Sequence, residues 1–186
     1  MMDRKINWQE EDRKYIWHPA QQMKDGEVFP PVVADHACGS YIYDEHGKEY
    51  IDIISSWWCN LLGHANREIN EAVKKQLDTM EHVIFSNFTH RPAIELAREL
   101  MTVLPRGLCR FNYCDNGSSA IECALKMAFQ YQQQTGQTQR TRFMCLDSSY
   151  HGETIGALSV GSMDLYARIY KPMMMNNIHL NGLDCF

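Results

Sequence analysis

The feature that most constrains this chain is a turn of small residues between a strand-like segment and a long helical one. Residues 108–114 alternate like a β-strand, residues 115–119 read Asp-Asn-Gly-Ser-Ser, and residues 120–134 have strong helical character that ends before Gly136. Residues 142–146 form a second short apolar segment that is typical of a buried strand. Strand, helix and strand in this order predict a right-handed crossover and a parallel pair, and therefore an α/β domain.

The part of the chain before this domain predicts a smaller α+β segment. Its first 27 residues are polar and charged, which indicates an N-terminal arm with a short helix. Residues rich in β-formers follow at 32–34, 41–43 and 50–53, and turn residues separate the last two groups. This pattern predicts a small antiparallel sheet.

Two amphipathic helices are predicted between the sheet and the α/β domain. Helical spacing begins after Asn66, and a second helix is predicted over residues 92–103, with a proline suited to its first turn. We expect residues 1–66 to form the arm and the small sheet. Residues 67–186 are then expected to form the beginning of a larger α/β domain.

Composition and charge exclude several classes of function. The 186 residues are 45% hydrophobic and 22% charged, which is ordinary for a globular protein, and the 18 basic and 23 acidic residues give a net charge of −5. Because there is no basic excess for phosphate-backbone binding, a nucleic-acid partner is not expected. No apolar run approaches a membrane span and no secretory signal is apparent, so we expect a cytoplasmic protein with reduced thiols. The spacing of the seven cysteines and eight histidines predicts no metal site.

The turn at residues 115–119 is a candidate anion site. The first amides of a helix have no partner within the helix, Gly117 permits a close approach, and the hydroxyl of Ser118 adds a donor. The helix dipole favours an anion there by about 0.3–1 kcal/mol. An ordinary capped helix, in which the serines serve only the backbone, explains the same residues.

Two aromatic positions are candidates for ligand contact. Tyr150 follows the second predicted strand, at the edge where α/β sheets bind ligands, and its ring can stack on a planar heteroaromatic group or simply cover the core. Trp57 and Trp58 close the N-terminal sheet, and in a strand they would point to opposite faces. One of them can then wall a pocket, although the residues alone favour a core position for both.

Five motifs in this chain stand in the order found in class III aminotransferases, which the chain resembles from about residue 13 to residue 172. They are Trp17-His18-Pro19, Ser55-Ser56-Trp57-Trp58, His90-x-Pro92-Ala93-Ile94-Glu95-Leu96, Asp115-Asn116-Gly117-Ser118-Ser119-Ala120-Ile121-Glu122 and Tyr150-His151-Gly152-Glu153-Thr154-x-Gly156-Ala157. The glycine-serine turn and the Tyr-His-Gly segment are shared across the class. The first two motifs are typical of the member that acts in biotin biosynthesis.

This resemblance implies a fold, a cofactor and a site. The chain is expected to be the N-terminal part of a fold-type I transferase that depends on pyridoxal 5'-phosphate (PLP), with residues 67–186 as an incomplete PLP-binding domain. Gly117 and Ser118 would hold the cofactor phosphate, Tyr150 would stack on the pyridine ring, and Trp57 would line the substrate pocket. The implied reaction moves the amino group of S-adenosylmethionine to 8-amino-7-oxononanoate, giving 7,8-diaminononanoate, in a homodimer.

The chain departs from the family pattern in three ways. Ala20 stands where an aromatic residue often follows His-Pro, and Glu153 stands where an aspartate often follows Tyr-His-Gly. Family chains are more than twice as long, and none of the eight lysines here matches the motif of the lysine that forms the Schiff base. We therefore expect an N-terminal fragment that contains no catalytic residue and is inactive alone, with that lysine beyond Phe186. The alternatives are another class III aminotransferase or an aminomutase, and a non-catalytic fragment.

Overall fold

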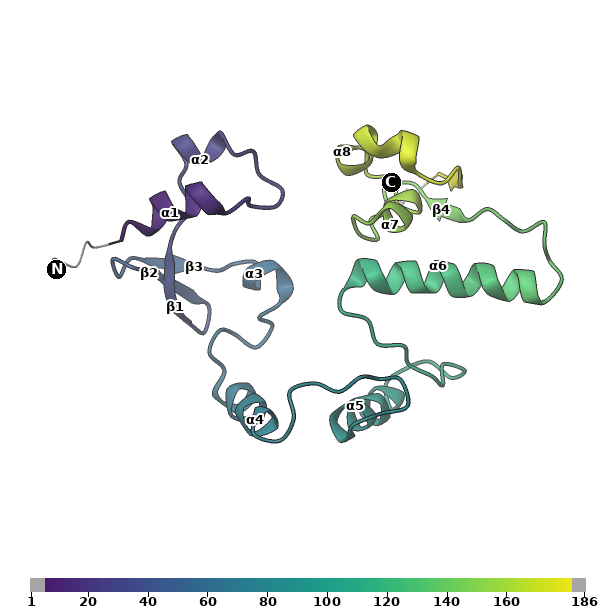
Figure 1. Ribbon diagram of the computed structural model, residues 1–186, viewed down its shortest axis with the longest axis horizontal. Coiled ribbons are helices and arrows are strands. Elements are labelled where there is room, and N and C mark those ends of the chain that lie inside the picture. The colour runs from purple at the N-terminus through teal and green to yellow at the C-terminus, as the bar shows by residue number, and fades with distance from the viewer. Residues whose placement is uncertain (1–5, 182–186) are drawn as a thin grey trace. The chain divides into compact units, whose positions relative to one another are not determined.

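The computed structural model describes residues 6–181, which fall into two compact units (Figure 1). The first unit extends to His90 and the second begins at Arg91. This division follows contacts within the chain, whereas the boundary predicted after residue 66 concerns the domains of a whole enzyme and stays a prediction.

A three-stranded antiparallel sheet forms the centre of the first unit. Its strands lie in the order β1 (Ala34–Cys38), β2 (Tyr41–Asp44) and β3 (Glu49–Ile51). The sheet was predicted from the sequence, but its first strand lies at 34–38 and overlaps the predicted 32–34 only at Ala34. Gly39, in the β1–β2 turn, has a φ of +57°, a left-handed conformation that glycine adopts without strain.

The turn between β2 and β3 is held by the carboxylate of Asp44. Its Oδ1 accepts hydrogen bonds from the backbone N–H groups of His46 and Lys48, both at 2.9 Å, and its Oδ2 accepts one from the Tyr50 hydroxyl at 3.0 Å. These bonds, led by that of Lys48, lower the pKa of Asp44. The turn is therefore closed by a side chain as well as by the backbone ladder.

Between residues 6 and 90, four helical segments accompany the sheet. They are α1 (Trp8–Tyr15), α2 (Asp25–Val28), α3 (Ser55–Trp58) and α4 (Arg67–Leu77). The predicted start of the helix after Asn66 is confirmed, because the Asn66 side chain accepts a hydrogen bond from the Ile69 N–H and caps α4.

The second unit contains the α/β arrangement, with a parallel pair of short strands. Its elements in order are α5 (Arg91–Met101), α6 (Gly117–Gln134), β4 (Met144–Leu146), α7 (Ile155–Ser159), α8 (Asp164–Ala167), the 3-10 helix η1 (Arg168–Met173) and β5 (Ile178–Leu180). Strand β4 pairs in parallel with β5, and Cys145 lies opposite His179. The helices between them make the crossover connection.

Two details of the predicted α/β pattern are corrected by the structure. Residues 108–114 form no strand, because none of the described segments joins them in a β-ladder, and β4 pairs with β5 instead. Helix α6 begins at Gly117, three residues earlier than predicted, because Asn116 caps it and brings the whole glycine-serine turn into the first helical turn.

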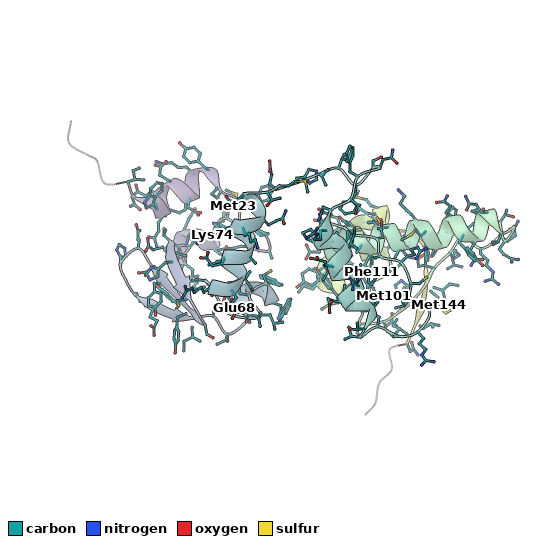
Figure 2. All side chains as sticks on the ribbon, turned by 90° about the horizontal axis from the view of Figure 1, so that it is seen from below. Met23, Glu68, Lys74, Met101, Phe111 and Met144 are labelled. Atoms are coloured by element: carbon teal, nitrogen blue, oxygen red, sulfur yellow. The ribbon has the colours of Figure 1, made fainter. Side chains whose placement is uncertain are left out.

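The buried core of the second unit surrounds α7. Five apolar residues and two polar ones are buried there: Cys145, Ala157, Leu158, Val160, Ala167, Ser159 and Asn177. Both buried polar side chains have hydrogen-bond partners. Asn177 Nδ2 donates to the Ser159 carbonyl at 2.8 Å, and Ser159 Oγ accepts from the Met175 N–H at 2.9 Å. Larger apolar side chains remain exposed elsewhere, among them Met101 and Met144 (Figure 2).

Asn177→Ala is expected to destabilise the protein by about 1–3 kcal/mol, because it strands the Ser159 carbonyl and the Phe143 N–H, which now donates to Asn177 Oδ1 at 3.3 Å. Urea unfolding measures the change. The neighbouring exposed Asn176→Ala is the matched control and should stay within about 0.5 kcal/mol. Equal effects of the two substitutions would contradict the role given to Asn177.

Candidate active site

The start of α6 is an open helix terminus with its cap in place. Asn116 has extended backbone angles, and its Oδ1 accepts the Ser119 N–H at 2.9 Å. Gly117 and Ser118 follow as the first helical residues, whose amides have no partner within the helix. A Cβ built on Gly117 would meet no atom within 4 Å, so the space beside this backbone is open. The geometry suits an anion approaching an 18-residue helix from its positive end.

The segment after β4 returns to this helix start and touches it closely. Ser118 Oγ accepts a hydrogen bond from the Glu153 N–H at 3.3 Å. Gly152 lies so close that a Cβ there would clash with the Ser118 side chain, and its φ of +124° is one that other residues rarely adopt. Only glycine therefore allows the loop and the helix to meet at this point.

Glu122 makes a second connection between the same two segments. It lies one helical turn after Ser118, on the same face of α6. Its Oε1 accepts the N–H groups of Gly156 at 2.8 Å and Ala157 at 3.3 Å, at the start of α7. A hydrogen bond from the Thr154 side chain, followed by these backbone bonds, lowers the pKa of Glu122 despite its partial burial. The loop is thus fixed to α6 at two successive turns.

Tyr150 lies in the loop that these contacts position. Its hydroxyl donates to Glu153 Oε1 at 3.2 Å, and its ring packs against Tyr166 with 5.6 Å between centroids. Burial, with the Glu153 charge next, raises the pKa of Tyr150, so the hydroxyl stays protonated and able to donate. The side chain is 51% exposed, which excludes the simple core-covering role in the described chain. The structure therefore brings Gly117, Ser118 and the Tyr150 loop together.

Trp57 belongs to the first unit and lies in an unusual backbone conformation. Ser55, Ser56, Trp57 and Trp58 all have positive φ, at +49°, +47°, +64° and +66°. This segment, α3, is consequently a left-handed turn and not the end of a strand. A left-handed conformation costs a non-glycine residue roughly 1–2 kcal/mol, and four in succession are rare.

Both tryptophans are exposed, so the expectation of two core positions is wrong. Trp57 is 65% and Trp58 76% exposed, and their rings pack edge to face with centroids 6.3 Å apart. The expectation failed because it assumed a strand, in which one of two successive side chains faces the sheet's covered side. In the left-handed turn neither ring reaches a core.

A buried carboxylate fastens this turn to the sheet. Asp52 Oδ1 accepts the Ser56 N–H at 2.9 Å, and Oδ2 accepts both the Ser56 hydroxyl at 2.7 Å and Nε2–H of His64 at 2.7 Å. Side-chain exposure is only 6% for Asp52 and 15% for His64. These bonds, led by the two from Ser56, lower the pKa of Asp52 to about 2.

The lowered pKa predicts how stability depends on pH. Because the pKa of Asp52 is about 2 in the folded protein and about 4 in an unfolded chain, its stabilising contribution is present above about pH 4 and is lost as the pH falls towards 2. Asp52→Asn should therefore lower the melting temperature of the protein most at about pH 5–7, with the difference from wild type shrinking below about pH 4. Asp35→Asn, at an exposed carboxylate of β1, is the control and should change little at any pH. A pH-independent difference for Asp52→Asn would argue against the assignment.

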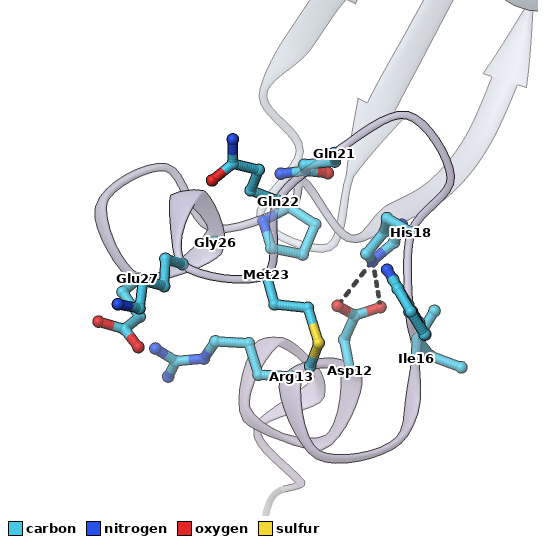
Figure 3. Close-up of a pocket in the computed structure, with 12 residues that line it drawn as sticks. Asp12, Arg13, Ile16, His18, Gln21, Gln22, Met23, Gly26 and Glu27 are labelled. Carbon is cyan, nitrogen blue, oxygen red and sulfur yellow. Dashed lines mark hydrogen bonds and ion pairs between the residues drawn. The ribbon is translucent and has the colours of Figure 1, made fainter. Parts of the chain in front are cut away.

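A pocket of about 320 Å³ lies in the N-terminal arm, beside the Trp17-His18-Pro19 motif (Figure 3). His18 Nε2 contacts both carboxylate oxygens of Asp12, at 2.9 and 3.1 Å. Apolar and charged side chains line the pocket together, with Met23 and Arg13 among them. Ala20, which departs from the family pattern, follows this motif with a φ of +55°.

The described chain offers neither a membrane-spanning helix nor a metal site. Among residues 6–181, no helix is long and apolar enough to cross a membrane. Within the same range, no group of three or more His, Cys, Asp or Glu side chains is arranged to hold a metal ion.

Comparison with known proteins decides the family. The model of the family "Aminotransferase class-III" matches residues 22–184. The chain belongs to the class III aminotransferases. A relative from Geobacter sulfurreducens named adenosylmethionine-8-amino-7-oxononanoate aminotransferase is 43% identical over 175 residues, which make up 94% of this chain and 39% of that protein.

Solved structures show the same fold. The crystal structure of adenosylmethionine-8-amino-7-oxononanoate aminotransferase from Methanocaldococcus jannaschii is 38% identical, with a TM-score of 0.90 over 94% of this chain and 40% of that one. The omega transaminase from Pseudomonas jessenii in complex with PMP is 26% identical, with a TM-score of 0.87 over 95% of this chain and 39% of that one. These matches confirm the predicted fold-type I transferase architecture. The chain spans about 40% of the length of the relatives it matches.

Several residues that build the site were missed by sequence reasoning. Gly152 and Glu122 were noted only as parts of motifs, and Asp52 and His64 were not singled out at all. Gly152 could have been found from its place directly after Tyr-His, in a loop that must approach a helix start. The contacts of Asp52 and His64 had no comparable signal, since 12 residues separate them in the chain.

Proposed function

We propose that this chain is the N-terminal part of a PLP-dependent aminotransferase that moves the amino group of S-adenosylmethionine to 8-amino-7-oxononanoate. The product would be 7,8-diaminononanoate, in biotin biosynthesis. The observation that carries the proposal is that relatives named for these substrates match nearly the whole chain. We further propose that the full-length protein acts as a homodimer in the cytoplasm.

The residues of the second unit fit the phosphate of PLP. The amides of Gly117 and Ser118 point out of the helix start, the space beside Gly117 is open, and the Asn116 cap leaves both amides to a ligand. The Tyr150 ring, half exposed in the adjoining loop, offers a face for a planar heteroaromatic ring. The helix start can thus hold an anion while the Tyr150 ring holds a flat ring, because the contacts of Ser118 and Glu122 fix the loop beside the helix.

Each group then has one task in the reaction. PLP, when bound, supplies the electron sink that amino-group transfer requires. The amides of Gly117 and Ser118 bind its phosphate, and the Tyr150 ring orients its pyridine ring. Glu153 accepts a hydrogen bond from the Tyr150 hydroxyl and so limits rotation of the Tyr150 side chain. Trp57 would line the substrate pocket.

The group that moves the proton is proposed to lie outside this chain. None of its eight lysines stands in the family's lysine motif. Lys126, the lysine of α6, lies two turns beyond Ser118, and its charge acts on Glu122 instead. The isolated 186-residue chain is therefore expected to bind phosphate ligands at most and to catalyse nothing.

Gly152→Ala is expected to weaken PLP binding by the full-length protein about tenfold or more, because the added methyl group pushes the Tyr150 loop away from Ser118. Absorbance titration of the cofactor measures the affinity. Gly107→Ala is the matched control, since Gly107 also has a strongly positive φ of +102° but a Cβ there meets nothing within 4 Å. Equal losses for the two variants would show that backbone strain alone is responsible.

The activity itself is tested by extending the reading frame. We expect the coding DNA after the Phe186 codon to continue into a lysine-bearing segment, and the full-length protein to form diaminononanoate from the two proposed substrates. Turnover with ω-amino acid donors but not with S-adenosylmethionine would favour another class III enzyme. A stop codon in an otherwise intact locus would leave a non-catalytic product and end the catalytic assignment.

A further inference from the structure

The left-handed turn at residues 55–58 is held by a chain of contacts that begins in the sheet. The Asp52 N–H donates to the Ser40 carbonyl at 2.9 Å, which continues the antiparallel ladder beyond β3. His64 pairs with Gly39 through two backbone hydrogen bonds, of 2.8 and 3.0 Å. The side chains of Asp52 and His64 meet, and the backbone of each residue is hydrogen-bonded to one of two adjacent residues, Ser40 and Gly39, in the β1–β2 turn.

From this anchor the contacts lead directly into the turn. Asp52 holds both the backbone N–H and the hydroxyl of Ser56, and the Trp58 N–H donates to the Ile54 carbonyl at 2.8 Å. Trp57, between the two fixed residues, therefore has little freedom to leave its positive φ. Its exposed ring is presented by the turn and is not supported by a core.

Gly63 shows how closely the two sides of this anchor approach. A Cβ on Gly63 would lie 3.2 Å from the backbone of Gly39, in addition to the strain of its own φ of +83°. The segment that carries His64 is thus held against the β1–β2 turn by backbone contact as well as hydrogen bonds. The Asp52 and His64 side chains that meet here are only 6% and 15% exposed.

We propose that Asp52 and His64 are positioning residues: they hold Ser55–Trp58 in its left-handed conformation and so fix the orientation of Trp57 toward the substrate. The proposal deepens the proposed function and rests on it, because the role of Trp57 as a pocket wall is part of that function. Neither residue touches a reacting atom. Their effect on the reaction passes through the indole ring.

The test is a double-mutant cycle in the full-length protein. Asp52→Ala and Trp57→Ala should each raise KM for the substrates by roughly 10- to 100-fold with a smaller change in kcat. The double variant should be no worse than Trp57→Ala alone, because Asp52 acts through the ring that is already absent. Asp52→Asn, which keeps the acceptor for the Ser56 N–H but loses the Oδ2 acceptor for the Ser56 hydroxyl and His64, should fall between wild type and Asp52→Ala. If Asp52→Ala does not fold, Asp52→Asn replaces it in the cycle.

Asp44→Asn is the matched control, because Asp44 is a carboxylate of the same sheet with three comparable hydrogen bonds that hold a different turn. It should lower the melting temperature without changing KM. Additive losses in the Asp52–Trp57 cycle, or equal KM values for Asp44→Asn and the Asp52 variants, would overturn the proposal.

A second readout does not depend on activity. The edge-to-face pair of Trp57 and Trp58 should give a near-ultraviolet circular dichroism signal that Trp57→Phe identifies by difference. Asp52→Ala and His64→Ala should abolish that signal and Asp44→Asn should keep it; retention in all three would overturn the proposal. Absence of turnover in the wild type, with the signal still dependent on Asp52, would refute the proposed function and leave the holding of the turn established.

Discussion

The site of the second unit depends on one close approach, that of Gly152 to the Ser118 side chain at the start of α6. This contact places the loop after β4 beside the open helix terminus, and the bond from the Glu153 N–H to Ser118 Oγ closes it. Together with the Glu122 contacts one turn further along α6, it holds the loop that carries Tyr150 beside the helix start. A side chain at position 152 is excluded by sterics and by the backbone conformation together, so the requirement for glycine is absolute in this geometry.

A carboxylate plays the same physical part in both units. Glu122 accepts two backbone N–H groups at the start of α7, and Asp52 accepts the Ser56 N–H and hydroxyl at the left-handed turn. In each case an ionised oxygen satisfies donors that the loop cannot pair within itself, which is why both pKa values are lowered. Charge-assisted hydrogen bonds thereby fix the start of α7 and the left-handed turn.

Elements that depend on interactions between residues close in the sequence were predicted well, and elements that depend on distant residues were not. Helices α4 and α6 and the β2–β3 turn depend on neighbouring residues, including the caps Asn66 and Asn116, and these were predicted to within a few residues. Residues 108–114 have a strand's alternation, yet a strand exists only where another segment pairs with it, and no local pattern identifies that segment. The choice of β5 as the partner of β4, 34 residues away, was equally beyond local reasoning.

The candidate site divides in the same way. Gly117, Ser118 and Tyr150 were identified because a helix start and a sheet edge have intrinsic chemistry that one short motif reveals, whereas their roles toward PLP remain proposals. The conformation of Trp57 was not predictable, since four left-handed residues in succession contradict local backbone preference.

The two units therefore carry different parts of the proposed function. The second unit holds the residues proposed to contact the phosphate and the pyridine ring. They lie in the glycine-serine turn and the Tyr-His-Gly loop, the two motifs by which the chain resembles class III enzymes in general. The first unit holds Trp57 and the Trp17-His18-Pro19 arm, which are the motifs typical of the biotin-pathway member. Binding of the cofactor needs only free backbone amides for its phosphate and an aromatic side chain for its ring. A capped helix supplies the first and one loop the second, at little conformational cost. Selecting one substrate among many amines needs a rigid wall of defined orientation, and the first unit obtains it by forcing a strained turn against a buried carboxylate.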